Sequence, residues 1–334
     1  MITPTRLSYG VLIATIALAV LLHLGVPLLV LLFSYFALRQ LYFLTKRKWL
    51  ALILFGVVVA GITAAAVYFT RTAILALPDV ADTSIPSASA WAQKRQIELP
   101  FTDFESLRQA VVDTLGQEAQ YLRNVANFAK SAAAAIVFSI LSIVAAGSLF
   151  YKTGLDPYRG THRLKNNLYS ICCDKVSTRF RDFYRSFATV MGAQITISLI
   201  NTALTGIFLV AVRLPHAPLL IAVTFLCGLV PIVGNLASNT VIVFVALTVS
   251  LKLAIVALVF LILIHKLEYL LNSKIIGDRI RNPVWLTLIA LILGERLMGI
   301  PGLILAPVVL NYLRAEMLTV EVPAPSETVE ALNR

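Results

Sequence analysis

Long segments of this chain contain no charged residue, and this constrains the fold more than any other feature. Segments without Asp, Glu, Lys or Arg include residues 7–38, 49–70, 131–151, 186–212 and 214–251. A transmembrane helix needs roughly 20 consecutive apolar residues, and these segments reach about that length or exceed it. Only 13% of the residues are charged, whereas soluble domains carry about 25%. We therefore expect an all-α, polytopic membrane protein.

The positive charge of the chain lies in short runs between the apolar segments. The net charge is +11 at pH 7, and residues 46–48 form one such run. Basic loops mark the cytoplasmic side of a membrane protein, so this pattern indicates orientation and not nucleic-acid binding. We expect both termini to lie in the cytoplasm, with the lipid bilayer as a partner.

Composition divides the chain into six predicted parts with about eight transmembrane segments. An amphipathic helix within 78–130 lies along the membrane domain or forms an oligomer contact. The basic segment 152–186 has one aromatic face, so it either anchors to anionic lipid or moves as a coupling element. The predicted parts are 1–77 (N-terminal transmembrane helices), 78–130 (external loop and amphipathic helix), 131–151 (fourth transmembrane helix), 152–186 (basic cytoplasmic amphipathic linker), 187–315 (core with broken or re-entrant helices) and 316–334 (cytoplasmic tail).

The apolar run after residue 214 is interrupted by Pro231 and Gly234, with Asn235 and Asn239 directly beyond. Proline removes an amide donor and clashes with the preceding turn of a helix. At membrane depth, irregular backbone is tolerated only where it packs within protein or lines a wet cavity. We therefore expect a broken helix at this point, forming one wall of a polar pocket.

Two further irregular segments follow, at residues 272–283 and 294–302. The second contains Glu295, a further candidate for a substrate or ion path. It lies inside an apolar stretch that is too long for one straight crossing, so we expect two shorter helices in a hairpin. Glycine and proline at such places absorb changes of chain direction. The hinge candidates are Gly277, Pro283, Gly299, Pro301 and Gly302.

Polar side chains recur at helical spacing in the second half of the chain. Gln194 and Asn201 are seven residues apart and share a helix face, where they either bond to a neighbouring helix or line a polar path. His265, Glu268 and Asn272 follow at i, i+3 and i+7. The His265–Glu268 pair is a candidate proton or cation site, unless these side chains contact lipid headgroups at the cytoplasmic interface.

The order of motifs from Arg185 onward resembles the AI-2E family, the bacterial autoinducer-2 exporter or PerM-like (UPF0118) family. The matching stretches are Met191–Gln194, Leu229–Gly234, Glu268–Gly277, Asn282–Pro283, and Gly294 through Gly299–Gly302 to Ala306–Pro307. The chain departs from the family pattern at Asn235 and Asn239, where many members carry proline. The resemblance implies a transporter of the bacterial inner membrane, and a homo-oligomer for which a pentamer is one form.

These observations favour a secondary transporter, because the chain contains no phosphate-binding Gly-x-x-x-x-Gly-Lys sequence. Export of a small polar molecule ranks above cation/proton antiport, because no aspartate lies in the middle of a predicted crossing of the core. A channel, or a non-transporting scaffold of the cell envelope, is also compatible with the pattern. No spacing typical of a catalytic triad, metal site or cofactor site occurs, so we expect no enzyme, no metal and no cofactor.

Overall fold

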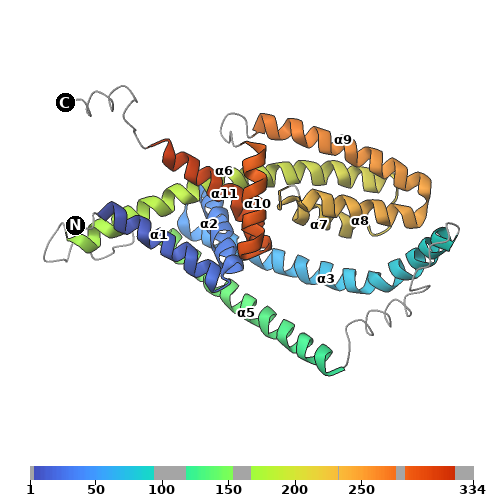
Figure 1. The fold of residues 1–334 in the computed structure, drawn as a ribbon, viewed down its shortest axis with the longest axis horizontal. Helices are drawn as coiled ribbons and strands as arrows, with labels where there is room; N and C mark the ends of the chain where they lie inside the picture. The colour runs from blue at the N-terminus through green and yellow to red at the C-terminus, as the bar shows by residue number, and fades with distance from the viewer. Residues whose placement is uncertain (1–3, 94–117, 153–166, 232, 276–282, 320–334) are drawn as a thin grey trace, which may run out of the picture.

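The structure is a computed structural model, and it contains helices and their connections but no strand in the residues that it describes. This confirms the predicted all-α class. The described residues are 4–93, 118–152, 167–231, 233–275 and 283–319. The helices are α1 (Pro4–Leu21), α2 (Gly25–Thr45), α3 (Lys48–Gln93), α5 (Glu118–Tyr151), α6 (Leu168–Ala211), α7 (Ala217–Gly228), α8 (Val233–Val249), α9 (Leu251–Ile275), α10 (Val284–Met298) and α11 (Ile300–Met317) (Figure 1).

Five helical segments within the described residues are long and apolar enough to cross a bilayer: Gly25–Thr45, Lys48–Thr72, Ala133–Tyr151, Leu168–Ala211 and Ile300–Met317. Many of their large apolar side chains are exposed, as on Ile53, Val57 and Ile207. In water such a surface would be costly, whereas in a bilayer it faces lipid tails. The chain is therefore a multi-pass membrane protein. The predicted total of about eight crossings stays a prediction.

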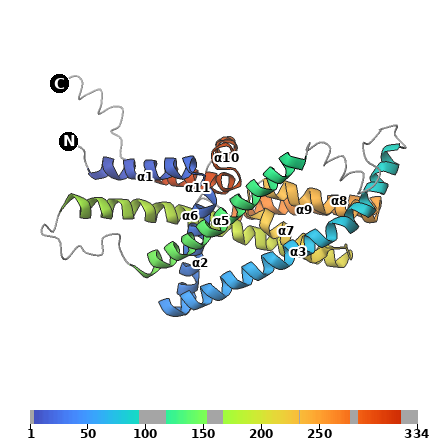
Figure 2. The same cartoon turned by 90° about the horizontal axis from the view of Figure 1, so that it is seen from below.

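Helix α6 connects two packed groups of helices. Its N-terminal half packs with α1, α2 and α11 around Phe183, Phe187 and Met191, and its C-terminal half packs with α7, α8 and α9 around Leu209. Its 44 residues span about 66 Å at 1.5 Å per residue, which is why one helix reaches both groups. Figures 1 and 2 show α6 running along the molecule from the side of α1 to the side of α9.

At three predicted boundaries the polarity of the sequence changes, but the helix continues. Helix α3 continues to Gln93, so the predicted loop does not begin at residue 78. Helix α5 passes residue 130 and α6 passes residue 186 without interruption. Prolines in α3 remove single hydrogen bonds without ending the helix, and no proline occurs in α5 or α6. Residues 94–117, with most of the predicted external amphipathic helix, lie outside the described residues.

The predicted hairpin near the C-terminus is confirmed. Helices α10 and α11 meet at Gly299, whose φ of 64° and ψ of −140° reverse the chain. They cross at Gly294 and Gly302, where a Cβ on either residue would overlap the backbone carbonyl of the other. Only glycine permits this approach, so the sequence Gly-x7-Gly sets the distance between the two helices.

Candidate functional site

The predicted break in the apolar run lies between α7 and α8. Pro231 has no amide hydrogen to continue α7, and the chain turns through Val230, whose amide donates to the Cys227 carbonyl at 2.8 Å. The Gly234 amide then donates to the Val230 carbonyl at 3.2 Å. A Cβ on Gly234 would overlap the Cys227 carbonyl oxygen, so glycine is required for α8 to begin directly beside the end of α7.

Side chains of α6 satisfy the carbonyls that α7 leaves free at its C-terminal end. Gln194 Nε2 donates to the Gly228 carbonyl at 2.7 Å, and Ser198 Oγ donates to the Phe225 carbonyl at 2.9 Å. The last four carbonyls of any helix lack partners within it, and an unpaired one is costly in hydrocarbon. The structure therefore supports an interhelical role for Gln194, which acts as a cap on the broken helix.

Glu268 on α9 is the central charged group of this region. Its carboxylate accepts hydrogen bonds from Asn235 Nδ2 on α8, at 2.6 Å to each oxygen. Asn201 on α6 also interacts with this carboxylate. Glu268, Asn235 and Asn201 are only 8%, 9% and 4% exposed. We call these three residues the Glu268 cluster; it joins α6, α8 and α9 immediately beside the helix break.

Burying a carboxylate is costly unless hydrogen bonds or charges compensate. Two amide side chains supply part of this compensation, and Asn235 is the third residue of α8, where the positive end of the helix dipole favours an anion. His265 Nδ1 lies 3.6 Å from Glu268 Oε2, and the side chain of His265 is 67% exposed against 10% for Glu268. His265 therefore connects the buried carboxylate to the outside of the helix group.

Two oxygen atoms beside the cluster have no hydrogen-bond partner in the part of the chain that the structure describes. They are Asn201 Oδ1 and Thr202 Oγ1, on adjacent residues of α6, and both are buried. Each buried, unpaired polar atom costs about 1–3 kcal/mol. Such atoms call for an explanation, and of the two only Asn201 belongs to the Glu268 cluster.

Some of the remaining predicted site residues adjoin the Glu268 cluster along the chain, and others do not belong to it. Asn239 is half-buried one turn beyond Asn235, and Pro231 and Gly234 form the turn itself. Glu295 is exposed in the last turn of α10 and is not part of the Glu268 cluster, and Pro283 is exposed at the start of α10. The Asn272 side chain and Gly277 lie outside the described residues.

The sequence analysis missed two residues that support the site. Ser198 lies one turn after Gln194 on the same face of α6, so the helical spacing of Gln194 and Asn201 could have indicated it. Ser238 is 1% exposed and donates to the Asn235 carbonyl at 3.2 Å. Serine in a membrane helix usually bonds to its own backbone, so its type alone gave no signal.

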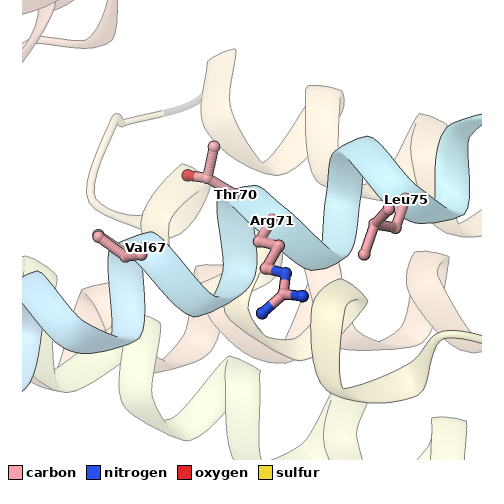
Figure 3. A pocket seen from close by; sticks show the side chains of 5 residues that line it. Val67, Thr70, Arg71 and Leu75 are labelled. Carbon is pink, nitrogen blue, oxygen red and sulfur yellow. The ribbon is translucent and has the colours of Figure 1, made fainter.

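A pocket on α3 lies apart from the Glu268 cluster. Its lining residues are Ala66, Val67, Thr70, Arg71 and Leu75, all from one helix (Figure 3). The lining is mostly apolar, and it contains none of the predicted site residues. This pocket therefore adds nothing to the polar centre between α6, α8 and α9.

Comparison with known sequences agrees with this architecture. The sequence profile described as "AI-2E family transporter" matches residues 9–320, nearly the whole chain. The chain belongs to the AI-2E transporter family. The expectation from the motif order in the C-terminal half is thereby confirmed.

Two curated relatives from Bacillus subtilis (strain 168) are similar to this AI-2E family member. "Putative transport protein YdbI" is 27% identical over 187 residues, which is 55% of this chain and 51% of that protein. "Putative transport protein YtvI" is 28% identical over 196 residues, which is 56% of this chain and 49% of that protein. The chain thus spans about half the length of the curated relatives that it matches.

Proposed function

We propose that this chain is a secondary transporter of the bacterial inner membrane, and that it exports a small polar molecule along a path past the Glu268 cluster. The observation that carries this proposal is a buried carboxylate that accepts hydrogen bonds from an amide of α8 and interacts with Asn201 of α6, directly beside a helix break. Ionisable residues inside membrane proteins characteristically mark substrate or ion paths. The unpaired oxygen of Asn201 supplies a further polar contact for a passing solute.

The broken helix suits alternating access. In secondary transporters, discontinuous helices place helix ends near the middle of the membrane, where they bind substrates and coupling ions. Here the C-terminal end of α7 and the N-terminal end of α8 meet beside Glu268. Because these ends are held by side chains of α6 and α9, a movement of either helix changes the site.

Cation/proton antiport is the second candidate function, and the contact between His265 and Glu268 favours it. A carboxylate that exchanges a proton for a cation needs a route to water, and exposed His265 lies 3.6 Å from Glu268. Histidine side chains relay protons in many proteins. In this second function, the cluster binds the coupling cation itself.

The test is flux through the purified full-length protein in proteoliposomes. Antiport is measured in vesicles that contain a pH-sensitive dye and are given a sodium gradient. Export is measured as uptake of radiolabelled small polar solutes by the protein molecules that are oriented inside-out. We expect Glu268→Gln to lower the flux about tenfold or more, which corresponds to about 1.4 kcal/mol in the barrier.

Glu295→Gln is the matched control, because Glu295 is an exposed glutamate outside the cluster. We expect its flux to equal that of the unmodified protein. Equal flux in Glu268→Gln and Glu295→Gln would contradict the proposed path. Sodium-driven proton movement without flux of any solute would favour the antiporter.

A further inference from the structure

A second polar cluster lies far from Glu268, where α1, α6 and α11 pack side by side (Figures 1 and 2). Arg179 on α6 forms an ion pair and hydrogen bond with Glu316 in the last turn of α11. Tyr9 on α1 donates to Glu316 Oε1 at 2.8 Å. The Arg179 guanidinium also lies over the Tyr9 ring, 4.2 Å from its centroid. Three residues distant in sequence thus hold three helices together.

The environment of this contact distinguishes it from a surface ion pair. The Arg179 and Glu316 side chains are each only 17% exposed. Weakly exposed charges are little screened by salt, and removing one partner leaves the other charge without compensation. In contrast, the Arg185–Asp182 pair one to two turns along α6 is 70% and 35% exposed. The first pair therefore has the larger effect on helix position.

Tyr312 offers a second partner in the same place. It lies one turn before Glu316 on α11, and its hydroxyl is buried without a hydrogen-bond partner among the described residues. Its ring packs edge-on against Phe183 of α6, with 5.6 Å between centroids. A buried hydroxyl without a partner calls for an explanation, and Arg179 lies close enough to Tyr312 to interact with it electrostatically.

The cluster of Tyr9, Arg179 and Glu316 lies where it can control the position of one end of α11. The N-terminal end of α11 is fixed differently, because Pro301 packs against Gly25 of α2 and Gly302 against Gly294 of α10. The C-terminal end of α11 is joined to α6 and α1 by the charged cluster. Helix α6 also carries Asn201 of the Glu268 cluster, so one continuous helix connects the two polar sites.

We propose that Tyr9, Arg179 and Glu316 form a latch that holds the C-terminal end of α11 against α6 and α1. Opening separates Arg179 from Glu316 and frees the C-terminal end of α11 to move relative to α6 and α1. Its link to transport rests on the proposed function, whereas the latch itself is a property of helix positions.

The experiment measures the distance between α6 and α11 in the full chain in lipid nanodiscs. Spin labels are attached at Lys175 and Met317, both exposed, after replacement of Cys172, Cys173 and Cys227. We expect one narrow distance distribution with the latch intact. Arg179→Gln and Glu316→Gln should each add a population at longer distance, because the C-terminal end of α11 is no longer held against α6.

Three further variants make the test decisive. Tyr9→Phe keeps the ring beneath Arg179 but removes its hydroxyl, and should give a smaller population of the longer distance. The exchange Arg179→Glu with Glu316→Arg should restore the short distance, and Arg185→Gln should leave it unchanged. An unchanged distribution in both neutralised variants, or an equal shift in Arg185→Gln, would overturn the latch. No solute is needed, so failure of the transport proposal is separately visible.

Discussion

The crossing of α10 and α11 gives the sharpest prediction, the replacement Gly302→Ala. The Cβ of alanine would overlap the Gly294 carbonyl oxygen and would lie 3.1 Å from Gly294 Cα. These are backbone atoms, which cannot rotate away as a side chain does. The two helices must therefore move apart, and the apolar contacts of Leu303 and Ala306 around the crossing loosen with them.

The magnitude follows from two opposing effects. Forcing an additional carbon into a packed contact costs about 1–3 kcal/mol. Alanine in place of glycine favours a helix by up to about 1 kcal/mol. Because the overlap is with backbone atoms, the cost lies in the upper part of that range, about 2–3 kcal/mol. After a gain of about 1 kcal/mol from helix propensity, Gly302→Ala should destabilise the protein by about 1–2 kcal/mol. Gly56→Ala is the matched control, because Gly56 lies within α3 and a Cβ there meets no atom within 4 Å.

The assay is unfolding in mixed micelles with increasing SDS, followed by the fluorescence of the three tryptophans. One of these, Trp285, lies on α10 and reports the hairpin directly. We expect the Gly302→Ala midpoint to fall and the Gly56→Ala midpoint to stay level or rise. If Gly302→Ala is as stable as Gly56→Ala, the close crossing of α10 and α11 is wrong.

Three other replacements can be measured in the same unfolding assay. Gly299→Ala should cost about 1–3 kcal/mol, because φ of 64° with ψ of −140° is unfavourable for alanine even in open space, and unchanged stability would refute this conformation. Gln194→Leu should cost about 1–3 kcal/mol by leaving the last carbonyl of α7 unpaired, whereas Gln40→Leu at an exposed position should cost little. Asn235→Leu should cost about 2–3 kcal/mol by removing both hydrogen bonds to the buried carboxylate of α9, and an equal loss in Asn239→Leu would count against that role.

The structure gives a physical reason for asparagine at position 235, where the chain departs from the family pattern. The family resemblance leads one to expect proline near this position, and proline has no side-chain donor. In this chain the Asn235 amide donates to both oxygens of Glu268. The sequence predicted that Asn235 belongs to one wall of a polar pocket, but not that its side chain bonds directly to Glu268.

Features that depend on local chemistry could be predicted from the residues alone. The length of the apolar runs indicated a helical membrane protein, because unpaired backbone groups are too costly in lipid. Pro231 and Gly299 predicted the α7–α8 break and the α10–α11 hairpin, because proline lacks an amide donor and glycine adopts positive φ. Polarity at residues 78, 130 and 186 marks no helix end, because helices continue through polar residues whose backbone bonds are local.

Which side chains meet became known only from the packing of the helices. Gln194 lies 34 residues from the carbonyl that it caps, and Arg179 lies 137 residues from Glu316. Helical spacing assigns a residue to a face of its own helix, but it does not say which neighbour that face contacts. The neighbour that each face contacts depends on how all the helices pack together. This packing forms the Gln194 cap, the Glu268 cluster and the contact between α1, α6 and α11.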